Sequence, residues 1–564
     1  MTRARAFLLT SDVRRAAMLN APPTAQNLPH LLERLQDVDA ANRRCVYLGV
    51  LRALVDEQPV EEADGVRFVA SLGLGEAAIT EVAKTGMHER DESVRRAARK
   101  LAYHWLTACG GNILVLLEHL HVSTSGAGEP VVLALLEDHA EVQDAAAMLV
   151  SNRDFWSEMG PERAVLTRCL VQYLAAHGLD ARIDDVMPPV TALAFCIQGE
   201  YEALSDMLEQ QAVEELEEDM PAIQDAQSGD SVFVLDELLA LAMRADFGDE
   251  IGRRKMFVLV REMLANAWLP AVLVPRCLDV LLGLSAGQRD FAQMVVELVQ
   301  ALEDDSEAPD TPHDAPDAPD AGVMQTPVRD SLSWQTRLAA DTPAQAAQRA
   351  ALDERRLLIV RAMLERVASS LQDNVAFHGL IPQLIVPAVK SKDAAVREQG
   401  LVCLGLCSLL DAQMALDTFP LLLDQIQRAT GGIRERCIEC LFDLLVVHGV
   451  DALVARSAQV AQAEYDGDEE RALQFARQQL LAFLLGLLED DDPVAQAVAT
   501  EGFAKLLLTG VVASDDVVRS LVLVYMSPDT ADNQALRQCL SYFLPLYFSS
   551  HARHQRVIER VRRR

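Results

Sequence analysis

The segment that decides the fold class runs Leu380-Ile-Pro-Gln-Leu-Ile-Val-Pro-Ala-Val-Lys-Ser-Lys-Asp-Ala-Ala-Val-Arg-Glu-Gln-Gly-Leu-Val-Cys-Leu-Gly-Leu-Cys-Ser-Leu-Leu410. It predicts two helices joined by a tight turn at Lys390–Lys392, and Asp393 is placed to cap the second helix. One face of that helix repeats every 3.6 residues, at Val396, Gly400, Cys403, Leu404 and Cys407. A single hairpin of this kind cannot bury its apolar face, so it must stack on copies of itself.

Related hairpins recur along the chain. Each has an acidic residue or a turn, then Val-Arg or a relative of it, and then an apolar helix. The copies are Asp12–Ala17, Asp91–Ala98, Asp393–Arg397, Gly432–Arg436 and Asp491–Val494. Helical pairs at about 40–47 residues are typical of HEAT repeats. In such a hairpin we expect the Asp to cap a helix and the Arg to bridge to the next repeat. The sequence therefore predicts an all-α fold, an α-solenoid of HEAT repeats.

Composition agrees with helix-on-helix packing. Half of the 564 residues are hydrophobic and only 5% are aromatic, and alternating β-branched strands bounded by Asn-Gly or Asp-Gly turns are scarce. A solenoid of this length needs no single central core. The apolar run near the N-terminus is too weak for a signal peptide, and no run reaches the ~18 apolar residues of a membrane span. We expect an intracellular protein with no membrane partner.

Motifs for catalysis and for metal binding are missing. The chain has no G-x-x-x-x-G-K-[ST], G-x-S-x-G or H-E-x-x-H pattern. Cys437-Ile-Glu-Cys440 is formally a C-x-x-C pair, but no second pair lies near it, as a zinc site would require. We therefore expect no enzyme activity, no catalytic residue, no metal and no cofactor.

Charge is unevenly distributed along the chain. The net charge is −33, yet residues 1–110 hold fifteen Lys/Arg against fourteen Asp/Glu. Basic residues occupy matching places early in two predicted second helices, and stacking would align them into a ridge that suits phosphate binding. The candidates are Arg43, Arg44, Arg95, Arg96, Arg99 and Lys100. A solvated face with salt bridges between repeats explains the same residues, and charge alone leaves both interpretations open.

An acidic, proline-rich segment interrupts the array. Residues 303–346 show no apolar periodicity and predict a disordered acidic linker. The expected organisation is an N-terminal HEAT array over residues 1–302, this linker, and a C-terminal HEAT array over residues 347–564. Within the linker, Thr326-Pro-Val-Arg resembles a proline-directed kinase site, which makes Thr326 a phosphorylation candidate.

The C-terminal part resembles a known family. Four short motifs are similar to the C-terminal HEAT domain of the condensin subunit 3 family, also called CAP-G. They are Val396–Gly405, Glu501–Leu506, Leu536–Leu540 with the following Phe543-Leu-Pro545, and Tyr525 with Pro528. The N-terminal half is similar as well, around Gly111–Leu114. The resemblance thus covers most of the chain, although the family's array has further repeats before the equivalent of Asp12, and we expect these to be lacking here.

The resemblance implies a non-SMC regulatory subunit of condensin that acts in mitotic chromosome condensation. Such proteins bind the kleisin subunit (CAP-H type), and through it the SMC ATPase pair. With kleisin they hold double-stranded DNA without sequence preference. The implied location is the nucleus and chromosomes, with a cytoplasmic pool in interphase. The alternatives are a karyopherin-like HEAT transport receptor, which would bind a small GTPase and repel DNA, or another HEAT scaffold of the phosphatase type.

Overall fold

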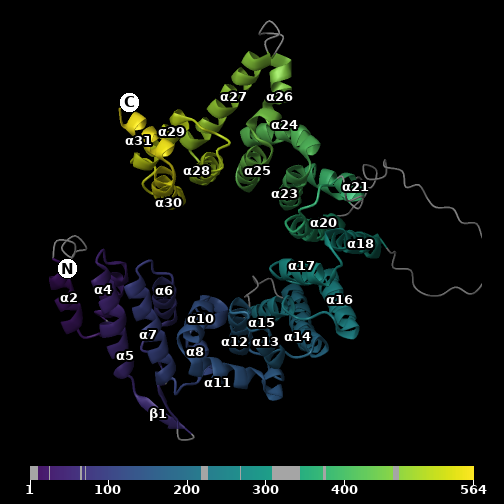
Figure 1. Ribbon diagram of the computed structural model, residues 1–564. Helices are drawn as coiled ribbons and strands as arrows, with labels where there is room; N and C mark the ends of the chain where they lie inside the picture. The colour runs from purple at the N-terminus through teal and green to yellow at the C-terminus, as the bar shows by residue number, and fades with distance from the viewer. Residues whose placement is uncertain are drawn as a thin grey trace, which may run out of the picture. The chain divides into compact units, whose positions relative to one another are not determined.

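The chain is helical throughout the part described in the computed structural model, apart from one small hairpin (Figure 1). The description covers residues 10–24, 26–63, 66–69, 71–217, 226–266, 268–307, 343–371, 377–461 and 469–563. It divides into two compact units, Met1–Leu284 and Ser285–Arg564. The predicted fold class, an α-solenoid of HEAT repeats, is confirmed.

The first unit is built from short and medium helices in sequence order. They are α2 Ser11–Asn20, α3 Leu28–Leu32, η1 Glu33–Gln36, α4 Ala40–Cys45, η2 Val46–Leu51, α5 Arg52–Asp56, α6 Glu76–Met87, α7 Glu92–Ala108, α8 Ile113–His119, α9 Val122–Ser125, α10 Gly128–Asp138, α11 Ala140–Val150, η3 Arg153–Trp156, α12 Pro161–Ala176, α13 Asp180–Val186, α14 Val190–Glu217, α15 Ala226–Ala242, α16 Glu250–Ala265 and α17 Leu273–Leu284.

Packing in this unit runs from each repeat to the next. One helix of each repeat lies on its counterpart, in the order α4, α7, α10, α12, α15 and α17. Trp105 and Tyr47 are both 1% exposed and lie among the largest side chains of this core. A Cβ at Gly86 would come within 2.9 Å of the Tyr47 ring and 2.6 Å of the Ala98 Cβ. The missing side chain therefore lets α6 approach its neighbours closely, as a stacked array requires.

One element was not expected from the sequence. Strands β1 (Val60–Ala63) and β2 (Val66–Val69) pair in antiparallel register, with Val60 opposite Val69. The sequence signal for this hairpin is the Asp-Gly pair between the strands, which favours a tight turn. β2 contacts α7, so the hairpin is attached to the solenoid rather than forming a sheet domain.

The second unit continues the same construction. Its helices are α18 Gln288–Glu307, α20 Pro343–Leu364, α21 Phe377–Leu380, η5 Ile381–Ile385, α22 Val386–Val389, α23 Ala394–Leu410, α24 Ala412–Arg428, α25 Gly432–His448, α26 Val450–Ala461, α27 Glu469–Gly486, η7 Leu487–Glu489, α28 Pro493–Leu508, α29 Asp515–Met526, α30 Gln534–Ser550 and α31 Ala552–Arg563. Here the stack runs through α20, α23, α25, α28 and α30.

The hairpin at 380–410 forms as the sequence predicts. Asp393 accepts hydrogen bonds from the amides of Ala395 (2.9 Å) and Val396 (3.1 Å) and so caps α23. A Cβ at Gly400 would lie 2.8 Å from the Cβ of Ala388 and 2.9 Å from the amide nitrogen of Val389. Only glycine therefore fits this crossing of α22 and α23. The first helix is less regular than expected, because its η5 part is a π-helix in a region with two prolines, which supply no amide hydrogen.

Helices extend into both ends of the predicted linker segment. Helix α18 continues to Glu307 and α20 begins at Pro343, so both ends of the 303–346 segment are helical. Helices α18 and α20 also contact each other, and α18 belongs to the second unit rather than to the predicted 1–302 array. Residues 308–342, including the phosphorylation candidate Thr326, lie outside the described residues. The same holds for most of the acidic insertion at 464–470.

Candidate nucleic-acid interface

The basic residues of the first unit lie on helices with a repeated capping geometry. Asp39 caps α4 by accepting from Ala41 N (2.8 Å), and Asp91 caps α7 by accepting from Ser93 N (2.9 Å). Four residues after each cap an arginine turns back to the preceding turn. Arg43 donates to the carbonyl of Asp37 (2.8 Å) and Arg95 to that of Glu89 (2.9 Å). In the second unit Asp393 and Arg397 form the same arrangement, with Arg397 donating to Ser391 O at 3.0 Å.

Arg43, and two further arginines near the starts of other helices, also reach the turn of the next repeat. Arg14 of α2 pairs with Asp37 at 2.7 Å, and Arg43 of α4 pairs with Glu89 at 2.8 Å. Arg434 of α25 donates to Asp490, with Nη1 at 3.0 Å from Oδ1. Capping by the repeated Asp is confirmed at Asp91 and Asp393, and bridging by the Arg is confirmed at Arg14 and Arg434. The capping expectation is wrong at Asp12, which lies within α2 and is not its cap.

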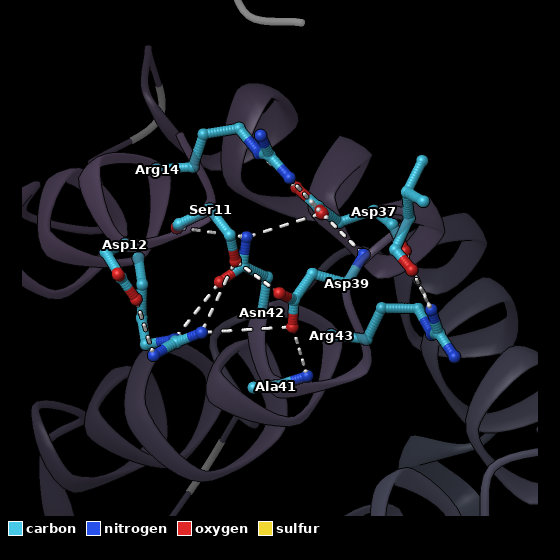
Figure 2. Close-up of polar contacts among 10 residues, drawn as sticks. Ser11, Asp12, Arg14, Asp37, Asp39, Ala41, Asn42 and Arg43 are labelled. Atoms are coloured by element: carbon cyan, nitrogen blue, oxygen red, sulfur yellow. Dashed lines mark hydrogen bonds and ion pairs between the residues drawn. The ribbon is translucent and has the colours of Figure 1, made fainter. Parts of the chain in front are cut away.

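Asp37 is the centre of the most heavily bonded of these turns (Figure 2). Its side chain is 1% exposed and accepts from Arg14 Nε (2.8 Å) and Nη2 (2.7 Å), the Asp39 amide (3.0 Å) and Asn42 Nδ2 (3.3 Å). Burial alone would raise the pKa of this carboxyl. The hydrogen bonds from Arg14 and Asp39 outweigh it and lower the pKa to about 2. Asp37 is therefore a charged structural group that joins two repeats.

Two consecutive arginines occur near the start of a helix in several repeats. The pairs are Arg14-Arg15, Arg43-Arg44, Arg95-Arg96 and Arg253-Arg254. Arg44 is exposed and has no partner within the described residues. Arg96 is 67% exposed, and its contact is with Glu92 of its own helix, at 3.4 Å. Because α4 and α7 pack together and both arginines lie five residues after their caps, they occupy equivalent positions on neighbouring helices.

The structure therefore divides the six candidates into two sets. The anchored set, Arg43, Arg95 and Arg99, is held by protein partners; Arg99 pairs with Glu137 (2.7 Å) and Asp138 (3.1 Å) of α10. The exposed set consists of Arg44, Arg96 and Lys100. Lys100 lies one turn beyond Arg96 on the same face of α7 and has no partner in the described part of the chain. For the two arginine pairs the sequence could have signalled this division, because the fourth residue after a cap points back to the turn and the fifth does not; the rule does not extend to Arg99 and Lys100.

The cysteine pair shows no sign of a reactive site. Burial raises the pKa of both Cys437 and Cys440 to about 12, so neither is a thiolate at neutral pH. Over the described residues, no group of three or more His, Cys, Asp or Glu side chains is arranged to hold a metal ion. None of the described helices is both long and apolar enough to cross a bilayer.

Comparisons with known proteins point to one family. Residues 355–562 match the family model of the C-terminal domain of nuclear condensing complex subunits (Cnd3). Condensin complex subunit 3 of Schizosaccharomyces pombe is 29% identical over 563 residues, covering 97% of this chain and 58% of that protein. The Saccharomyces cerevisiae protein of the same name is 26% identical over 588 residues, covering 98% and 53%. The chain thus spans little more than half the length of these relatives.

A solved structure agrees over almost the whole chain. The crystal structure of the S. pombe condensin Cnd3–Cnd2 subcomplex contains a chain with a TM-score of 0.76 and 27% identity to this one. The match covers 98% of this chain and 62% of that one.

Proposed function

We propose that this chain belongs to the condensin subunit 3 family and works as a non-SMC regulatory subunit of condensin, on the strength of its similarity to those proteins. In this role it binds the kleisin subunit, and through it the SMC ATPase pair, and it holds double-stranded DNA without reading its sequence. The chain contributes binding surfaces rather than chemistry. Its place of action is then the nucleus and the mitotic chromosome.

The observation that carries the proposal is the likeness to Cnd3, which was solved together with Cnd2. The likeness extends over 98% of this chain, so it involves both units rather than the C-terminal domain alone. In a solenoid each repeat stabilises only its neighbours, and an extended partner segment can bury a large surface as it orders along several repeats. A kleisin segment bound in this way would stabilise the array.

Exposed apolar side chains on α14 and α16 support partner binding in the first unit. Phe195 is 62% exposed, Ile251 is 73% exposed and Val258 is 51% exposed. The ammonium of Lys255 lies 3.5 Å from the centroid of the Phe195 ring, which is a cation–π distance. Packing between α14 and α16 brings these residues onto adjacent helices, where a partner could cover them together.

DNA binding is proposed for the exposed set on α4 and α7. Phosphate contacts need cations that are not already neutralised, and Arg44 and Lys100 have no protein partner in the described residues. The ion pair of Arg96 with Glu92 is exposed and is therefore easily exchanged for a phosphate. Such contacts fix the duplex without base readout, so the binding should be independent of sequence and sensitive to salt.

Reconstitution tests the proposal. The chain is co-expressed with a kleisin of the Cnd2 class or mixed with the GTP-bound GTPase of nuclear transport, and each mixture is analysed by size-exclusion chromatography and thermal unfolding. We expect a stable complex with kleisin only, and a higher melting temperature in that complex. Binding at a hundredfold excess over Kd would add about 2.7 kcal/mol to the free energy of unfolding. A complex with the GTPase, and none with kleisin, would favour the transport receptor.

A further inference from the structure

A groove in the second unit combines an apolar floor with positive charge. It has a volume of about 600 Å³ and lies between α22, α23, α24 and the turn before α25. Its apolar lining consists of Val386, Val389, Leu401, Leu404, Leu421, Ala429 and Ile433. Volumes of 300–1,000 Å³ with a mostly apolar lining and a few polar groups are typical of ligand pockets.

The charged residues of the groove are all cations. Lys390, Arg397 and Arg428 line it together with the neutral Gln425 and Thr430, and no carboxylate belongs to the lining. This is unusual in a chain whose net charge is −33. The charged part of the lining therefore favours an anionic ligand.

The three cations differ in how strongly protein partners hold them, and therefore in how easily they can contact a ligand. Arg397 is fixed, because it donates to Ser391 O at 3.0 Å and so maintains the turn. Lys390 is exposed and has no partner among the described residues. Arg428 is 77% exposed and pairs only with Asp424, four residues earlier on α24, at 2.8 Å. Lys390 and Arg428 can thus turn to an incoming anion at little cost, since exposed ion pairs contribute little to stability.

We propose that this groove binds a short acidic peptide segment of a partner protein. One or two large aliphatic or aromatic side chains of the peptide occupy the floor between Leu401, Leu404 and Leu421, and flanking carboxylates pair with Lys390 and Arg428. The apolar floor distinguishes such a peptide from duplex DNA, which offers phosphates but no apolar side chain that could fill the groove. The inference goes beyond the proposed function and depends neither on kleisin nor on the exposed set of α4 and α7.

The test uses the full chain and two fluorescent peptides. One peptide is rich in glutamate with leucine anchors, and the other has glutamine in place of every glutamate. Binding is followed by fluorescence anisotropy at low salt, and unfolding by circular dichroism confirms that each variant is folded. We expect the double variant Lys390→Glu with Arg428→Glu to bind the acidic peptide about tenfold or more weakly, because each carboxylate then meets a like charge.

Lys392 provides the matched control. It lies two residues from Lys390 and is also exposed, but it does not line the groove. Lys392→Glu should therefore leave the acidic peptide's affinity unchanged. The proposal would be overturned if the acidic peptide did not bind, if the glutamine peptide bound equally well, or if Lys392→Glu weakened binding as much as the double variant. It would also be overturned if duplex DNA displaced the peptide and the binding of that DNA depended on Lys390.

Discussion

The division of the six basic candidates makes a quantitative prediction for DNA binding. We compare two triple variants of the kleisin-bound protein. The first removes the exposed set (Arg44→Gln, Arg96→Gln and Lys100→Gln), and the second removes the anchored set (Arg43→Gln, Arg95→Gln and Arg99→Gln). Both remove three positive charges from α4 and α7, so they change the net charge equally. They differ in how the lost cation is held. Arg44 and Lys100 have no partner in the described residues and Arg96 contacts Glu92 of its own helix, whereas the anchored set is bonded to a turn or to the next repeat.

The expected effect follows from counterion release. Each lost phosphate contact reduces the slope of log K against log salt by about 0.9, so loss of the exposed set reduces it by about 2.7. Between 50 and 200 mM salt, the affinity difference between wild type and this variant should then shrink by roughly 40-fold. The anchored variant should keep nearly the wild-type slope. It should instead lose stability, by about 1–3 kcal/mol in all, chiefly because the partly buried carboxylate of Glu89 (13% exposed) loses its ion pair with Arg43.

The assay is fluorescence anisotropy with a labelled duplex of arbitrary sequence at several salt concentrations, alongside thermal unfolding of each variant. Equal slope reductions for the two sets would show that overall charge rather than free cations determines binding. An unchanged slope in the exposed variant would remove α4 and α7 from the DNA interface. A second duplex of unrelated sequence serves as a control and should give the same slopes.

Three further predictions concern packing, pH and modification. Gly502→Ala places a Cβ 2.2–2.5 Å from ring carbons of the buried Phe442 and should lower the free energy of unfolding by about 1–3 kcal/mol, measured by chemical denaturation. Gly486→Ala, where a Cβ would meet nothing within 4 Å, should not destabilise the protein, and equal effects of the two variants would contradict the packing. The pKa of Asp37 is about 2 in the folded protein and about 4 in the unfolded chain, which corresponds to roughly 2 kcal/mol of stabilisation. This stabilisation is present above about pH 4 and disappears as the pH falls toward about 2, so D37N should abolish that part of the pH dependence of the free energy of unfolding. Thr326 should carry phosphate in mitotic but not interphase cells, adding about −1.5 to −2 charge, and mass spectrometry that finds it unmodified in both would refute this.

Much of the fold could be predicted from local sequence because a solenoid is built from local contacts. The turn at Lys390–Lys392, the cap at Asp393 and the close approach at Gly400 all follow from residue type and spacing within one hairpin. The irregular π segment before α23 was not predicted, since periodicity places a helix but does not report how its hydrogen bonds are shifted.

The site was only partly predictable. Sequence identified the six basic residues and their equivalent positions, but it could not show that Arg99 is paired with α10, because that contact joins residues almost forty positions apart. The groove at Lys390 was not predicted at all. It forms only where side chains of two successive hairpins meet, so no single stretch of sequence contains its pattern.

The central claim is that the chain is a condensin subunit, and its partners in the cell test this most directly. The chain is tagged at its own locus, purified from mitotic cells under mild conditions, and its companions are quantified by mass spectrometry. The account predicts kleisin and both SMC subunits in amounts comparable to the tagged chain, and their loss when kleisin is depleted. Recovery of a nuclear-transport GTPase and assorted cargo, without kleisin, would contradict it.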